Sequence, residues 1–251
     1  VCSILDGFKN QQVLVNGILE PVKRDVVIKD LLTMTSGVAY PSDSEVGQIT
    51  NKVVDEAIEK ELMRKPLTTV EFANKLGQVP LEFQPGEKWA YGFSADILGA
   101  VIEVISGKEY REFLKEEFFI PLEMIDTDFY VPEEKWERFA KVYEYFEEEP
   151  KLRPYQGYNL AIMRQNRLPG FQSGGAGLVS TLDDYLHFDT MILNNGVYKG
   201  NRILSKESID FMRTNHLNEE QLKSYDWEDL KGYGYGTFVR VLKDKELANT
   251  P

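Results

Sequence analysis

The chain has 251 residues, 42% of them hydrophobic, and a formal net charge of −12 at pH 7. This size and composition predict a globular protein of one large domain or two small lobes with a sizeable core. Nucleic acid and anionic membrane surfaces would repel so acidic a chain, and no apolar run is long enough to span a membrane. Neither is therefore expected as a partner.

The first third of the sequence predicts one strand and three helices. Residues 11–19 alternate around Val13 and Val15, which is typical of a short strand before a turn at Gly17. Apolar periodicity predicts helices over three stretches: 27–37, 44–63 and 68–77. Thr68-x-x-Glu71 forms a capping-box pattern at the start of the last of these helices.

The segment FQPGEKWAYGFSADILGAVIEVISG, residues 83–107, changes from an extended, turn-bearing stretch into an apolar helix. Pro85-Gly86 indicates a turn, and Ser94 is interpreted as the cap of a helix over 94–106 rather than as a nucleophile. An aromatic cluster at the junction contains a single phenol, that of Tyr91.

The rest of the chain is predicted to be mixed, with helix predominating before residue 170. We expect a helix from about 110 to 118, a hairpin of 139–146 and 152–160, helices over 181–195 and from Ser205, and a strand-like end at 232–242. Asp183 and Asp184 are interpreted as first-turn charges favoured by the helix dipole.

Few residues suggest metal or thiol chemistry. His187 and His216 have no second His or Cys at metal-ligand spacing, so no metal site is predicted. The single cysteine, Cys2, excludes an internal disulfide, and with no His nearby it is a poor candidate for a nucleophile.

Four segments in order resemble the serine β-lactamase-related hydrolases, the group that joins class C β-lactamases, D-alanyl-D-alanine carboxypeptidases and related esterases. The segments are VIKDLLTMTSG, residues 84–107, IPLEMIDTDFYVP and GGAGLVSTLDDYLHFDTMILNNGVYKGNRILS. The resemblance implies an α+β fold of the β-lactamase/transpeptidase type. Residues 1–251 would form one incomplete domain, with 27–170 as a mostly helical lobe and 171–251 as part of an α/β lobe.

That family uses a Ser-x-x-Lys nucleophile, a Tyr-x-Asn base and a Lys-Thr-Gly or His-x-Gly strand beside the oxyanion hole. No lysine here has a serine three positions before it, and neither strand motif occurs. We expect these two elements to lie outside a chain that is the middle of a longer protein. An export signal would then also lie upstream, so the localisation stays open.

Tyr91 corresponds to the family's catalytic tyrosine, although a core tyrosine satisfied locally is the alternative reading. Gly92 and Phe93 replace the x-Asn that helps β-lactamases hold the substrate amide, which favours an esterase over a β-lactamase. The expected substrate-binding residues, beside Tyr91 and in the small-residue loop, are Trp89, Phe93, Ser173, Gly174 and Gly175. The loop reads equally well as a cleft border or as a tight turn.

The resemblance thus implies acyl transfer through an acyl-enzyme on a small ester, amide or peptide substrate, with no metal or organic cofactor. Because the two other catalytic elements are absent, this chain alone is expected to be inert. A non-catalytic binding module with the same cleft is the alternative. Nothing in the sequence predicts the oligomeric state.

Overall fold

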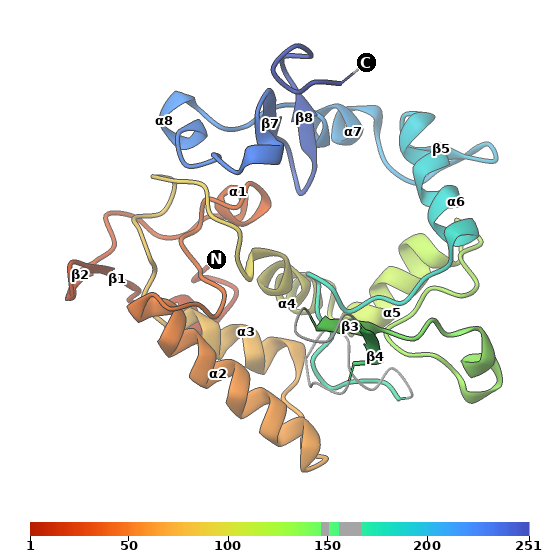
Figure 1. The fold of residues 1–251 in the computed structure, drawn as a ribbon, viewed down its shortest axis with the longest axis horizontal. Helices are drawn as coiled ribbons and strands as arrows, with labels where there is room; N and C mark the ends of the chain where they lie inside the picture. The colour runs from red at the N-terminus through yellow and green to blue at the C-terminus, as the bar shows by residue number, and fades with distance from the viewer. Residues whose placement is uncertain (147–150, 156–166, 251) are drawn as a thin grey trace.

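Helices dominate this computed structural model, which describes residues 1–146, 151–155 and 167–250 (Figure 1). The first half contains α1 (Ile28–Leu32), α2 (Glu45–Leu62), α3 (Thr69–Gly77), α4 (Ser94–Ser106) and α5 (Tyr110–Leu114), which continues into the π-helical η2 (Lys115–Phe119). The second half contains α6 (Leu182–Leu193), α7 (Lys206–Met212) and α8 (Glu219–Leu222). Three short 3-10 helices are η1 (Asp6–Phe8), η3 (Glu133–Arg138) and η4 (Glu228–Leu230).

The strands of the described residues form four separate antiparallel pairs. They are β1 (Gln12–Val15) with β2 (Ile18–Pro21), β3 (Tyr143–Phe146) with β4 (Lys151–Pro154), β5 (Val197–Tyr198) with β6 (Asn201–Arg202), and β7 (Tyr233–Tyr235) with β8 (Arg240–Leu242). The first strand is confirmed, and Asn16 and Gly17, both at positive φ, make the two-residue turn into β2. The second hairpin is confirmed in part, and residues 156–160 of that prediction lie outside the described ones.

Side-chain caps place four helix starts where the sequence predicts them. Ser44 Oγ accepts the N–H of Gly47, and Thr68, Thr181 and Ser205 accept in the same way at α3, α6 and α7. The helix predicted over 27–37 is shorter: it ends at Leu32, and Met34 follows with a φ of 55°. Residues 33–37 leave the helix because their backbone carbonyl groups accept hydrogen bonds from residues 82–90.

The main core lies around α4, which Figure 1 shows near the centre of the view with α2 and α3 on one side and α5 on the other. Phe72 and Leu76 of α3 pack with Ile97 and Ala100 of α4, and each is at most 1% exposed. Burial of four such side chains accounts for much of the pairing of these helices. The division of the chain into lobes at residue 170 stays a prediction.

The C-terminal third runs from α6 on the right of Figure 1 to α7, α8, β7 and β8, drawn in blue at the top, where it packs back onto the N-terminal half. A second core cluster joins Met34 and Trp89 to four residues of this third, namely Leu217, Tyr225, Leu230 and Tyr235. The two halves are therefore held together by an aromatic contact beside Tyr91.

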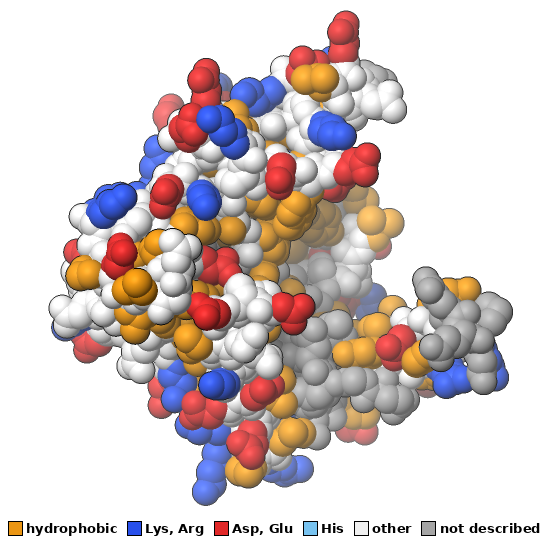
Figure 2. Space-filling model, turned by 60° about the vertical axis from the view of Figure 1, so that its left-hand side comes forward, with side chains coloured by type: hydrophobic (Ala, Val, Ile, Leu, Met, Phe, Trp, Pro, Cys, Tyr) orange, Lys and Arg blue, Asp and Glu red, His pale blue; other side chains and the backbone are white. Residues whose placement is uncertain are grey.

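Charged side chains of both signs are scattered over the face drawn in Figure 2, and apolar side chains gather in a recess toward its right-hand side. Within the described ranges, no helix has the length and hydropathy needed to cross a membrane.

Candidate active site

The extended segment that leads to Tyr91 is fixed by backbone hydrogen bonds to the segment after α1. The N–H of Gly86 donates to the carbonyl of Thr35 at 2.8 Å, and the N–H of Ala90 donates to that of Met34 at 2.9 Å. This pairing explains why α1 ends early: the residues that follow it support the tyrosine segment instead. The backbone that leads to Tyr91 is thus held in place by the segment after α1.

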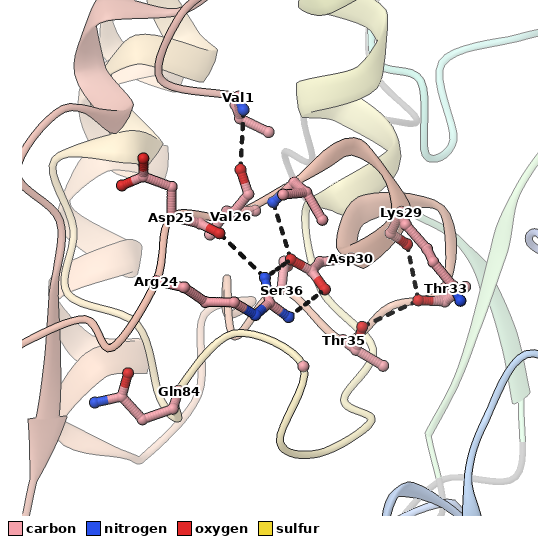
Figure 3. Close-up of polar contacts among 12 residues, drawn as sticks. Val1, Arg24, Asp25, Val26, Lys29, Asp30, Thr33, Thr35, Ser36 and Gln84 are labelled. Atoms are coloured by element: carbon pink, nitrogen blue, oxygen red, sulfur yellow. Dashed lines mark hydrogen bonds and ion pairs between the residues drawn. The ribbon is translucent and has the colours of Figure 1, made fainter.

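A half-buried ion pair between Arg24 and Asp30 lies next to the Pro85-Gly86 turn (Figure 3). Arg24 donates from Nη1 and Nη2 to the two carboxylate oxygens of Asp30, at 2.6 and 2.9 Å, and the Asp30 side chain is 6% exposed. A β-carbon on Gly86, whose φ is 83°, would lie 2.2 Å from Arg24 Nη2. Glycine therefore allows both the left-handed turn and the close approach of the guanidinium.

Tyr91 itself is 46% exposed at the end of this segment. Its ring lies 5.7 Å from that of Tyr40, 6.4 Å from Trp89 and 6.1 Å from Trp227, measured between centroids. The phenol forms no hydrogen bond or ion pair with any residue that the structure describes. The position combines a supported ring with an accessible hydroxyl group.

Two further phenols lie near Tyr91, and both are held neutral. Burial raises the pKa of Tyr40, and the charges of Asp96 and Tyr91 add to the shift. Burial also raises the pKa of Tyr235, with contributions from Tyr91 and Tyr225. Tyr91 is the exposed member of this group of phenols.

Trp89, which lies close to Tyr91 in the sequence, is buried. It is 4% exposed, its ring packs edge-on against Tyr225 at 4.6 Å, and its backbone N–H donates to Ser224 Oγ at 2.8 Å. The structure gives it a packing role between the tyrosine segment and the C-terminal third.

Phe93 is also directed into the protein. Its side chain belongs to the main core at 8% exposure, with the rings of Tyr40 and Phe72 at 4.5 and 5.6 Å. The preceding glycine permits this inward turn, because a β-carbon on Gly92 would lie 2.0 Å from the carbonyl oxygen of Val38.

Ser94 does not cap α4, which corrects the prediction from the sequence. Phe93 occupies the N-cap position, and Ser94 is the first residue of the helix. Its buried Oγ lies 2.9 Å from Ser36 Oγ, so the hydroxyl group joins α4 to the segment after α1. Because the hydroxyl group is buried in this contact, Ser94 is not accessible as a nucleophile, in agreement with the expectation from the sequence.

The loop of Ser173, Gly174 and Gly175 is a tight turn seated on α4. Ser173 Oγ donates to Asp96 Oδ1 at 2.6 Å, and the N–H of Gly175 donates to the same oxygen at 3.2 Å. The N–H of Gly177 closes the turn on the carbonyl of Ser173 at 3.1 Å. The tight-turn reading is confirmed, and the cleft-border reading is compatible with it.

Two acidic residues have roles that the sequence reading missed. Asp96 stands alone in an apolar helix start, a pattern that could have suggested its buried role. Asp184 lies in the first turn of α6, as the sequence indicates, but it is also 3% exposed and accepts hydrogen bonds from the N–H of Asp126 and from Thr127 Oγ1. No sequence signal marked Tyr40.

The two histidines contact backbone carbonyls, His187 that of Leu122 and His216 that of Phe211, both at 2.8 Å. Among the residues described, no group of three or more His, Cys, Asp or Glu side chains could hold a metal ion. A cavity of about 480 Å³ lies between residues 125–142 and 176–181, and Tyr91 is not among its lining residues.

Comparison with known proteins extends over nearly the whole chain. Residues 15–248 match the family model described as Beta-lactamase. Protein Rv1367c of Mycobacterium tuberculosis (strain ATCC 25618 / H37Rv) is 32% identical over 231 residues, which cover 89% of this chain and 53% of that protein. Esterase EstB of Burkholderia gladioli is 29% identical over 237 residues, covering 90% of this chain and 57% of EstB.

The fold agrees with these matches. The solved structure of "EstCE1, a hydrolase with promiscuous acyltransferase activity" superposes with a TM-score of 0.76 at 25% identity, covering 100% of this chain and 63% of that one. The α+β, β-lactamase/transpeptidase-like fold is therefore confirmed, as a part of the fold of the longer solved chains. The chain spans about half the length of the curated relatives it matches.

Proposed function

Because this chain belongs to the Beta-lactamase family, we propose that it contributes the tyrosine base of a serine hydrolase that acts through an acyl-enzyme. A serine from a Ser-x-x-Lys element would attack the substrate carbonyl and pass its proton, by way of Tyr91, to the leaving alcohol. Water would then attack the acyl-enzyme, lose its proton to Tyr91 and release the acid, and the serine would regain a proton.

The observation that carries the choice of substrate is the inward turn of Phe93. In β-lactamases, the family resemblance places an amide side chain two positions after the tyrosine, where it holds the substrate amide. Here that position is apolar and lies in the core against Phe72. An ester needs no such amide contact, so we propose an esterase-like activity on small acyl substrates rather than β-lactam hydrolysis.

The exposed phenol of Tyr91 fits the role of a proton carrier, but it needs a cation. A free tyrosine has a pKa of about 10, so about 0.1% is ionised at pH 7. In the family, lysines of the Ser-x-x-Lys and Lys-Thr-Gly elements stand near the tyrosine, and the sequence contains neither element. We therefore propose that the 251-residue chain alone is inert. We also propose that Ser173, Gly174 and Gly175 lie on the rim of the substrate site.

The test uses the reading frame extended upstream and downstream of this chain. If the extended protein contains Ser-x-x-Lys, it should react with a fluorophosphonate probe and hydrolyse p-nitrophenyl butyrate far faster than nitrocefin. Tyr91→Phe should then lower kcat by about 100-fold or more, as expected for loss of general base catalysis. Tyr145→Phe, on the exposed hairpin strand β3, is the matched control and should leave kcat unchanged. Unchanged turnover in Tyr91→Phe would remove this residue from the mechanism.

The absence of Ser-x-x-Lys from all 251 residues supports a second candidate, a binding module that keeps the tyrosine surface without catalysis. In that case the extended frame would contain no such motif and would not be labelled by the fluorophosphonate. Those two results together would contradict the hydrolase proposal and support the binding module.

A further inference from the structure

Asp96 is a buried carboxylate five positions after Tyr91 in the sequence, and it has no part in the proposed proton transfer. It is the third residue of α4 and 2% exposed. Burial raises the pKa of the Asp96 carboxyl group, and hydrogen bonds from Ser173 and Gly175 oppose that shift. Burying a carboxyl group costs free energy, so the contacts that it makes indicate its role in the structure.

What Asp96 holds is the turn at residues 173–177. Ser173 Oγ and the N–H of Gly175, which donate hydrogen bonds to Asp96 Oδ1, belong to that turn. The turn fits directly on the helix, because a β-carbon on Gly174 would lie 2.4 Å from the carbonyl oxygen of Ala95. Glycine at this position is thus required for the turn to reach the carboxyl group.

The same turn contacts the residue that supports Tyr91. A β-carbon on Gly175 would lie 3.0 Å from Asp96 Oδ2 and 3.3 Å from Tyr40 Oη, so Gly175 is wedged between carboxylate and phenol. The ring of Tyr40 in turn packs against that of Tyr91, with 5.7 Å between their centroids. A continuous set of contacts therefore runs from Asp96 through Gly175 and Tyr40 to Tyr91.

We infer that Asp96 is a positioning residue: by seating the 173–177 turn on α4, it fixes Tyr40 and thereby the ring of Tyr91. The inference rests on the proposed function, since orientation of this ring matters for turnover only if Tyr91 carries a proton. Misplacing a reacting group by about 1 Å can lower a rate about 100-fold, so the effect should be measurable.

Asp184 provides a matched control for a role in stability alone. It is the third residue of α6, is 3% exposed, and also holds a distant segment through the N–H of Asp126, at 2.8 Å, and Thr127 Oγ, at 2.7 Å. Asp184→Ala should therefore destabilise the fold about as much as Asp96→Ala. Among the described residues, its carboxylate accepts these two hydrogen bonds and none from the aromatic residues around Tyr91.

The first measurement needs no catalytic activity. The chain is labelled with 3-fluorotyrosine, and the ¹⁹F resonance of Tyr91 is assigned as the one lost in Tyr91→Phe. Asp96→Ala should shift and broaden that resonance, whereas Asp184→Ala should leave it in place. Asp96→Asn, whose Oδ1 can still accept both hydrogen bonds, should restore the wild-type position. If Asp96→Ala does not fold, Ser173→Ala, which removes one of the two donors, should show an intermediate shift.

An unmoved Tyr91 resonance in Asp96→Ala or in Ser173→Ala would overturn the inference, and so would an equal shift in Asp184→Ala. In the extended protein, Asp96→Ala should lower kcat at least about tenfold with KM little changed, and Asp96→Asn should recover it. A shifted resonance in a wild-type protein that shows no turnover would instead count against the proposed function alone.

Discussion

The hydroxyl groups of Ser36 and Ser94 lie 2.9 Å apart, each on a residue that is 1% exposed. They join the segment after α1 to the first residue of α4, three positions beyond Tyr91.

Removing either hydroxyl group should therefore destabilise the fold. Ser94→Ala leaves the Ser36 hydroxyl buried with one partner fewer, at a cost of about 1–3 kcal/mol. Ser36→Ala with Ser94→Ala should cost less than the sum of the single changes, because neither hydroxyl is then orphaned. Urea denaturation of the four proteins measures this coupling. Additive losses would contradict the contact, and loss of fluorophosphonate labelling in the extended Ser94→Ala protein would contradict its structural role.

Replacing Phe93 by asparagine recreates the family's Tyr-x-Asn pattern but should not create a β-lactamase. The amide would be buried in the core where Phe72 and Tyr40 pack, lowering the free energy of unfolding by about 3–5 kcal/mol. Phe93→Leu is the control and should cost clearly less. Nitrocefin hydrolysis by the extended Phe93→Asn protein above the wild-type level would show that the side chain can reach substrate.

Gly92→Ala should disturb the Tyr91 segment directly. The new methyl group would lie 2.0 Å from the carbonyl oxygen of Val38, and backbone on both sides must move, with a loss of about 1–3 kcal/mol or more. At Gly107, which follows α4 with a φ of 69° and open space around it, alanine meets only backbone strain of about 1 kcal/mol. Thermal unfolding compares the two. Equal losses, with the Tyr91 fluorine resonance unchanged, would argue against the tight approach.

Stability should fall in acid through Asp126. Hydrogen bonds from Arg138 and then Lys135 lower its pKa to about 2 from an ordinary value of 3.8. A lowered folded-state pKa means that the unfolded chain binds the proton more readily, so the stabilisation is present above pH 4 and is lost as pH falls toward 2. Because Arg138 is 60% exposed, we expect only about 1–2 kcal/mol.

Asp126→Asn should therefore lower stability at pH 7 and reduce its decrease between pH 4 and pH 2. The measurement is the urea midpoint at several pH values, with Glu134→Gln, an exposed residue of η3, as control. A pH dependence identical in wild type and Asp126→Asn would contradict the assignment.

Local patterns in the sequence predicted the helices well where a cap and an apolar period agreed, as at Thr68. They failed where a partner far along the chain decides the outcome. Serine is a common N-cap residue, but the hydroxyl group of Ser94 is buried against that of Ser36, 58 positions earlier in the chain. Asp184 lies in the first turn of α6 as predicted, but its hydrogen bonds to residues 126 and 127 could not be inferred from the local pattern.

The candidate site divides in the same way. Tyr91 could be placed from the order of motifs, because it is carried on a turn and a helix start that are local features. Tyr40 and Asp96 could not, since their roles depend on the 173–177 turn reaching α4 from about 80 positions away. The sequence could not show that the Trp89 ring is covered by residues 225–235, because adjacency in sequence does not reveal which of two neighbouring rings a later segment covers.

The covering of Trp89 has a consequence for the order in which the protein can fold. Its backbone N–H and the carbonyl of Gly86 bind Ser224 and Gln221, in each case 135 positions further along the chain. At a synthesis rate of about 5–20 residues per second, the ribosome adds those partners roughly 7–27 seconds after the tyrosine segment. Contacts of such long range also form late during refolding. Tyr91 therefore acquires its supported position only after α8 has docked, and denatured chains should recover the α3–α4 core before they recover this site.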